Sequence, residues 1–116
     1  LPVMKVQDQF TPATYNDPDL TERLAGAFKT AFGKTNVMEM EPVMGAEDFG
    51  QYGRQEPKIP ICIFWLGGVS PTTFELSKKE GKPLPSLHSA LFAPEREPSI
   101  KTGVTAMTMA ALELLE

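Results

Sequence analysis

Apolar residues recur at helical spacing in two stretches of the chain. Between Pro18 and Phe32, apolar side chains fall on one side of a helix and charged side chains on the other. Asp17 is a good N-cap residue, Pro18 suits the first helical position, and Gly33 favours a left-handed C-cap. A second apolar helical face follows in residues 99–115, made of Ile100, Val104, Met107, Ala111, Leu114 and Leu115. We therefore predict helices over residues 18–32 and 99–115.

Three other stretches have the pattern of β-strands. Residues 36–41 alternate methionine with glutamate, as a half-exposed strand does, and residues 1–7 are a weaker candidate. Residues 59–66, I-P-I-C-I-F-W-L, are almost entirely apolar, which is typical of a central strand covered on both faces. Cys62 would then be an inert thiol in the core. This order of elements predicts an α/β fold, with helices on both sides of a mainly parallel sheet.

The remaining segments are rich in glycine, proline and polar residues. Residues 42–53 form a loop with a short polar turn of helix around residues 47–52. Glu47 and Asp48 stand side by side at its start, either to cap the turn or to serve a functional site. Residues 69–99 contain five prolines and little periodicity, so we expect one long loop held by contacts. Loops of this length are usually functional or disordered.

Composition narrows the class of protein. The chain has 116 residues, 41% of them hydrophobic, enough for one globular domain with a core. Its net charge of -4, without a basic run, argues against nucleic acid as a partner. No apolar run approaches the roughly 20 residues that cross a bilayer. A single cysteine, which forms no internal disulfide, fits a reducing compartment, so we expect a soluble cytoplasmic protein.

His88, the only histidine, lies in the stretch K-P-L-P-S-L-H-S-A-L-F at 82–92. Imidazole titrates near neutrality and is the commonest metal ligand, so His88 is the first candidate for chemistry, although a lone histidine more often has a structural or incidental role. Zinc sites need three or four protein ligands, and no HxH, HExxH or CxxC spacing occurs. Ser86 and Ser89 flank the histidine outside any G-x-S-x-G setting. The plausible companion ligands are Glu47, Asp48, Cys62, Glu95 and Glu97. Their spacing does not indicate a closed zinc site formed by this chain alone.

Three motifs occur in order: P-V-M-G-A-E-D-F at 42–49, F-W-L-G-G at 64–68, and L-H-S-A-L-F at 87–92 followed by S-I-K-T-G-V at 99–104. Together they resemble the C-terminal part of the hippurate-hydrolase-like amidohydrolases, from residue 15 to the end of the chain. These enzymes belong to the dinuclear-metal peptidase family that also contains aminoacylases and carboxypeptidases. Ala46 and Ala90 stand where that family often has Ser and Pro, and neither change removes a metal-binding group.

The resemblance implies a hydrolase in which a metal-activated water attacks the amide bond of an N-acyl amino acid such as hippurate. It implies that His88 is a metal ligand. Glu47 would line the cleft or contact substrate without being the catalytic base, and Gly67 and Gly68 would border the same cleft. No catalytic residue lies in this chain under this interpretation. The cofactor would be two divalent ions, zinc first, with manganese, cobalt and nickel as alternatives.

The resemblance also implies that residues 1–116 are the C-terminal part of a catalytic domain, within a zinc-peptidase-like three-layer sandwich. The N-terminal half, with the other metal ligands and the base, and an inserted dimerisation domain would be absent. Residues 1–7 would be the strand returning from that insertion. The expected partners are a small N-acyl amino acid, the rest of the same enzyme and, for the parent enzyme, a second copy. The chain alone should be inactive.

A second hypothesis is a non-enzymatic α/β module that binds a protein partner. Met109 and Leu112 lie near the side of the 99–115 helix opposite its apolar face, whereas Gly103 and Ala110 allow close packing. Such a second apolar patch, with the long loop, would form the binding surface. This hypothesis predicts that His88 is buried with ordinary hydrogen bonds.

Overall fold

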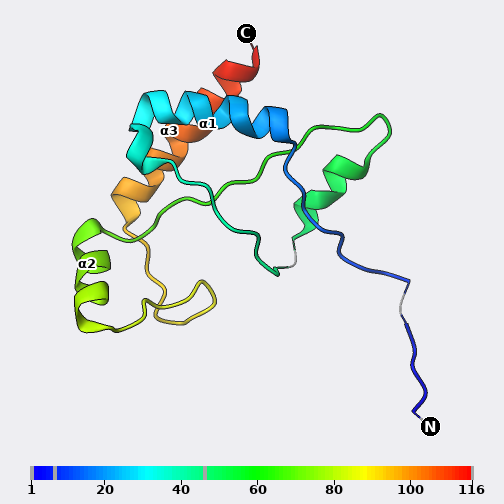
Figure 1. Cartoon of the computed structure of the whole chain (residues 1–116), viewed down its shortest axis with the longest axis horizontal. Helices are drawn as coiled ribbons and strands as arrows, with labels where there is room; N and C mark the ends of the chain where they lie inside the picture. Colours follow the sequence, from blue (N-terminus) through cyan, green and yellow to red (C-terminus); the bar gives the residue numbers. More distant parts are fainter. Residues whose placement is uncertain (1, 7, 46, 116) are drawn as a thin grey trace. The chain divides into compact units, whose positions relative to one another are not determined.

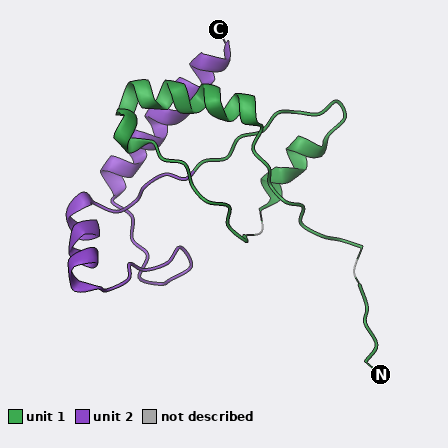
Figure 2. Ribbon diagram, viewed as in Figure 1, with its two compact units in different colours: residues 1–64 green, residues 65–116 purple. Residues whose placement is uncertain are grey.

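The computed structural model describes residues 2–6, 8–45 and 47–115 and divides into two compact units, residues 1–64 and 65–116 (Figures 1 and 2). The regular elements are all helical: α1 (Pro18–Phe32), the 3-10 helices η1 (Lys34–Asn36) and η2 (Asp48–Arg54), α2 (Pro71–Glu80) and α3 (Arg96–Leu115). None of the helices in these described ranges is long and apolar enough to cross a membrane.

Helix α1 has the predicted bounds. The Leu20 backbone N–H donates to Asp17 Oδ1 at 3.0 Å, and Pro18 occupies the first turn. At the other end, the Gly33 N–H donates to the Lys29 carbonyl at 3.1 Å. Gly33 has a φ of +89°, a region that favours glycine, but its ψ of 146° places it outside the left-handed helical conformation we predicted.

The predicted α/β fold, a three-layer sandwich around a mainly parallel sheet, is wrong for the described part of the chain, which contains no strand. Residues 59–66 were predicted to be a central strand covered on both faces, yet Ile63 is 43% exposed and Trp65 61% exposed. Residues 36–41 and 2–6 also lack strand structure, and Leu1 and Gln7 lie outside the described residues. A strand requires a neighbouring strand for its backbone hydrogen bonds. An apolar or alternating sequence does not by itself supply that neighbour.

The backbone of residues 61–63 is instead fastened to the start of α1. The Asp17 N–H donates to the Ile61 carbonyl at 2.8 Å. The Asn16 side chain then imitates a neighbouring strand, because its Oδ1 accepts from the Ile63 N–H and its Nδ2 donates to the Ile63 carbonyl, both at 2.8 Å. Three hydrogen bonds therefore join segments that are more than 40 residues apart.

Replacing Asn16 by Ala should destabilise the protein by about 1–3 kcal/mol, because two hydrogen bonds worth about 0.5–1.5 kcal/mol each are lost. Asn36→Ala is the matched control: its Nδ2 makes one local bond, to the Phe32 carbonyl at 2.7 Å, at the other end of the same helix. Urea unfolding of both variants measures the difference. A cost at Asn16 no larger than that at Asn36 would show that the long-range pair does not hold residues 61–63.

In residues 1–64 the core is small and aromatic. Leu24 and Phe28 on α1 are buried, as is Ile61. The Phe28 ring meets the Phe64 ring edge-on, with centroids 5.0 Å apart. The centroid of the Phe32 ring lies 6.3 Å from that of Phe28. Residues 61–64 therefore contribute side chains to the core even though they do not form a strand.

In residues 65–116 the predicted long loop contains helix α2. The Thr73 N–H donates to Ser70 Oγ at 3.2 Å, Pro71 begins the helix, and Gly81 ends it in the left-handed conformation with a φ of +65°. These cap residues were the signal in the sequence. The residues of α2 are mostly polar and exposed, so the helix has no apolar face that would produce a helical periodicity in the sequence.

Helix α3 begins three residues earlier than predicted and ends at the predicted residue. Its small residues are the buried ones: Ala106 and Ala110 are almost fully covered, and a Cβ on Gly103 would lie 3.3 Å from Leu66 Cδ2. The larger apolar face is exposed, at Ile100, Val104, Met107, Leu114 and Leu115. In the second patch, Leu112 is exposed and Met109 is half-buried.

Candidate functional site

His88 lies on an exposed loop made of two consecutive turns. The Ser89 N–H donates to the Ser86 carbonyl at 2.9 Å, and the Phe92 N–H donates to the Ser89 carbonyl at 3.0 Å. The Leu91 N–H also donates to Ser89 Oγ at 3.1 Å. His88 itself is exposed, and its imidazole makes no hydrogen bond or ion pair with any described residue. Both ring nitrogens are therefore available to a ligand.

Gly68 contacts the far end of that loop. The Glu95 N–H donates to the Gly68 carbonyl at 2.8 Å, and Pro94 packs directly on the glycine. Gly67 has open space around it. Of the residues predicted to form the site, Gly67, Gly68 and His88 therefore belong to one unit, and Gly68 supports the loop that carries His88. Sequence reasoning considered Glu95 only as a companion ligand and did not single out Pro94, because both residues meet Gly68 from about 26 positions further along the chain.

Glu47 belongs to the other unit, where it is exposed and caps η2. Its Oε1 accepts a hydrogen bond from the Phe49 N–H at 3.0 Å, which confirms the capping interpretation for Glu47. Its backbone carbonyl accepts from Thr14 Oγ1 at 3.4 Å. Gly50 makes this approach possible, since a Cβ there would lie 2.9 Å from Thr14 Oγ1. Ala46 lies outside the described residues.

The described ranges contain no group of three or more His, Cys, Asp or Glu side chains that could hold a metal ion. Cys62 is half-buried, and its sulfur accepts from Thr21 Oγ1 at 3.6 Å, so it is engaged with α1. Asp48 begins η2. His88 thus fits the role of one metal ligand, and this chain does not supply the rest of a metal site from its described residues.

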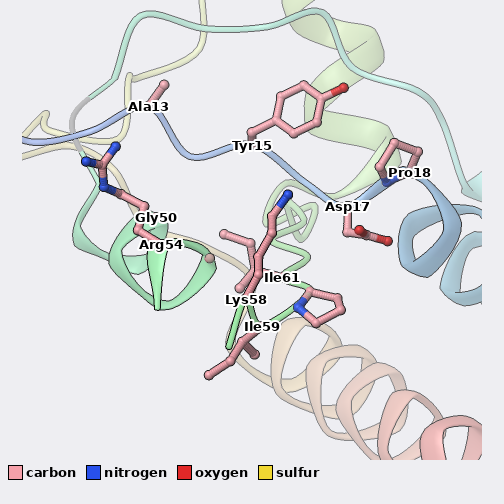
Figure 3. A pocket seen from close by; sticks show the side chains of 11 residues that line it. Ala13, Tyr15, Asp17, Pro18, Gly50, Arg54, Lys58, Ile59 and Ile61 are labelled. Atoms are coloured by element: carbon pink, nitrogen blue, oxygen red, sulfur yellow. The ribbon is translucent and has the colours of Figure 1, made fainter. Parts of the chain in front are cut away.

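A hollow of about 190 Å³, which the sequence did not predict, lies in residues 13–61 (Figure 3). Figure 3 shows Lys58 extending toward Tyr15, whereas Arg54 extends toward Ala13. The Arg54 guanidinium lies over the Phe10 ring, 5.6 Å from its centroid. The two cations do not converge on one point, so the hollow does not define an anion site.

Comparison with known proteins identifies the class. Residues 3–82 match the family described as Peptidase family M20/M25/M40, more than half of the chain. The chain therefore belongs to this peptidase family, in agreement with the resemblance of its motifs. No solved structure matches the chain significantly.

The curated relatives are deacetylases and carboxypeptidases by name. The chain is 47% identical over 57 residues to an N-acetyldiaminopimelate deacetylase of Shouchella clausii, covering 49% of this chain and 14% of the relative. It is 35% identical over 92 residues to a protein of the same name from Lactobacillus acidophilus, covering 79% of this chain and 20% of the relative. Against thermostable carboxypeptidase 2 of Saccharolobus solfataricus it is 30% identical over 110 residues, covering 95% of this chain and 24% of the relative. The chain thus spans between about one seventh and one quarter of these proteins.

Proposed function

We propose that this chain is the C-terminal part of the catalytic domain of a metal-dependent amidohydrolase, and that His88 is one of its metal ligands. The parent enzyme would cleave the amide bond of N-acyl amino acids. A divalent metal ion, when bound, activates a water molecule as the nucleophile. Two ions, zinc first and manganese, cobalt or nickel as alternatives, would be held jointly by His88 and by residues outside this chain.

The observation that carries the proposal is that His88, in a member of this peptidase family, is exposed and has no hydrogen-bond partner among the described residues. An exposed imidazole without a partner among the described residues is free to donate a nitrogen lone pair to a metal. Its loop is held by turn hydrogen bonds within residues 86–92 and by the Glu95–Gly68 bond. A ligand on a braced loop is held near one position, as metal coordination requires.

The exposed area supports the proposal that the chain is part of a larger domain. The chain exposes 10411 Å². A compact monomer of its mass would expose about 6,200 Å², and two separate compact units of half that mass about 7,500 Å² in total. The excess, together with the exposed face of α3, is surface that the rest of the enzyme would cover. Glu47, Gly67 and Gly68 would line the substrate cleft once it is complete.

The names of the relatives support the substrate class. A deacetylase that acts on N-acetyldiaminopimelate removes an acyl group from an amino acid, and a carboxypeptidase cleaves an amide bond next to a terminal amino acid. Both reactions cut an acyl group from an amino acid nitrogen. We therefore propose N-acyl amino acids, including hippurate, as substrates. A cytoplasmic location and a homodimeric parent enzyme are part of the same proposal.

The alternative, a non-enzymatic module that binds a protein partner, is less well supported. It predicted a buried His88 with ordinary hydrogen bonds, and His88 is exposed without a hydrogen bond to the described residues. Met109 is half-buried, so Leu112 is the one exposed residue of the two in the second patch.

The complete polypeptide containing this chain should release the free amino acid from hippurate or from an N-acetyl amino acid. Detection of the newly formed primary amine measures this release. Chelator treatment should abolish turnover, and zinc or manganese should restore it, because the nucleophile depends on the metal. The 116-residue chain alone should show no turnover under the same conditions. Absence of amide hydrolysis by the metal-loaded complete polypeptide would contradict the proposal, and activity of the isolated chain would contradict its assignment as one part of the site.

A further inference from the structure

The two glycines of the F-W-L-G-G motif have different surroundings. A Cβ on Gly67 would meet no atom within 4 Å. On Gly68 it would lie 3.0 Å from Pro94 Cβ, 3.7 Å from Pro94 Cα and 4.0 Å from Phe92 Cζ. A separation of 3.0 Å is well inside the optimal carbon–carbon distance of about 3.5–4.0 Å. The obstacle is a proline ring, which does not rotate away, so a side chain on Gly68 would have to displace residue 94.

Gly68 is not needed for an unusual backbone conformation. Among the described glycines, only Gly33 and Gly81 have positive φ. The requirement at Gly68 is therefore one of space, because Pro94 and Phe92 lie against the position that a Cβ would take.

Gly68 also closes the segment that carries His88. The hydrogen bond from the Glu95 N–H to the Gly68 carbonyl, at 2.8 Å, brings the two ends of residues 69–94 together. Within that segment, the Phe92 N–H donates to the Ser89 carbonyl, in the turn directly after His88. Contacts therefore run without a gap from Gly68 through Pro94 and Phe92 to the turn that presents the imidazole.

We infer that Gly68 is a positioning residue for His88: the absence of a side chain lets Pro94 and Phe92 seat on it and fixes the loop that presents the imidazole. The inference rests on the proposed metal-ligand role of His88. It adds that Gly67 has no part in this support. Metal–ligand distances in bound sites lie within about 0.2 Å of their standard values, so a shift of the loop by a few tenths of an ångström should weaken metal binding.

The test compares Gly68→Ala with Gly67→Ala in the complete polypeptide, with zinc affinity measured by chelator competition and zinc content by elemental analysis. Gly68→Ala should weaken zinc affinity by about tenfold or more, as changes in groups that support a ligand do. Gly67→Ala should change it by less than about twofold, because its Cβ meets open space. Equal affinities in the two variants would overturn the inference.

A double variant identifies the contact responsible. Pro94→Gly removes the ring atoms that the new Cβ would meet, so Gly68→Ala should cost much less zinc affinity in that background than alone. If Gly68→Ala fails to fold alone, recovery of folding and of zinc binding in the double variant supports the same contact. A double variant that is as defective as Gly68→Ala overturns it.

The His88→Ala variant distinguishes failure of the proposed ligand role of His88 from failure of the positioning role of Gly68. If His88→Ala leaves zinc content unchanged, the proposed ligand role itself fails, whatever Gly68 does. If His88→Ala loses zinc and Gly68→Ala binds it as the unmodified protein does, the ligand role stands and the positioning role of Gly68 fails.

Discussion

Replacing His88 by Ala in the complete polypeptide should remove about one zinc ion per subunit and lower kcat/KM by more than about 100-fold. The magnitude follows because loss of a group that merely supports a metal ligand already costs about 10–100-fold in affinity or activity, and here the ligand itself would be removed. In the described residues the imidazole makes no hydrogen bond that the change would break. The fold should therefore tolerate the substitution, and a thermal midpoint near that of the unmodified protein checks this.

The matched control for His88 is Ser86→Ala, two residues earlier on the same exposed loop. The Ser86 carbonyl accepts the turn hydrogen bond from Ser89, and alanine keeps that carbonyl. Metal content should stay at the level of the unmodified protein. Unchanged zinc content in His88→Ala, or an equal loss in both variants, would show that the imidazole is not a ligand.

Phe28→Ala should cost about 3 kcal/mol of unfolding free energy, the low end of the range for large aromatic residues in cores, because the core here is small. Phe28 is 8% exposed, and its ring meets Phe64 at 5.0 Å between centroids. The loss combines the transfer of a large apolar side chain with the cavity left between α1 and residues 61–64. Urea titration at an unchanged m-value measures the cost.

Phe32→Ala provides the comparison, since it makes the same chemical change one turn later on α1. Phe32 is half-buried, and its ring lies 6.3 Å from that of Phe28. We expect about 1 kcal/mol, because burying a side chain in part stabilises it less than burying it fully. Equal costs for the two variants would indicate that the contact between Phe28 and Phe64 does not organise this core.

The cap chemistry of this chain was readable from sequence because it is local. Asp17 caps α1 through the N–H of a residue three positions away, and Glu47 caps η2 through that of Phe49. Local bonds need no knowledge of the rest of the chain. Ser70, Pro71 and Gly81 are the same kind of local cap signal and mark the ends of α2, although its residues lack apolar periodicity.

The strand predictions were wrong because strand formation depends on long-range pairing, whereas helix caps depend on local contacts. Residues 59–66 have the composition of a buried strand, yet pairing depends on a partner that composition does not specify. Their hydrogen bonds come from Asn16 and Asp17, more than 40 positions earlier. Likewise the apolar pattern of α3 identified its helix but not which face is buried, because Gly103, Ala106 and Ala110 take the close contacts.

By itself, the sequence determined the bounds of α1, the family and the choice of His88 as the candidate ligand, since each depends on residue type and short spacing. Only the tertiary structure decided that His88 is exposed on a loop closed by Gly68 and Glu95, and that Gly67 and Gly68 differ. That distinction depends on which atoms from about 26 residues away come to rest against each α-carbon, and chain folding alone sets those distances.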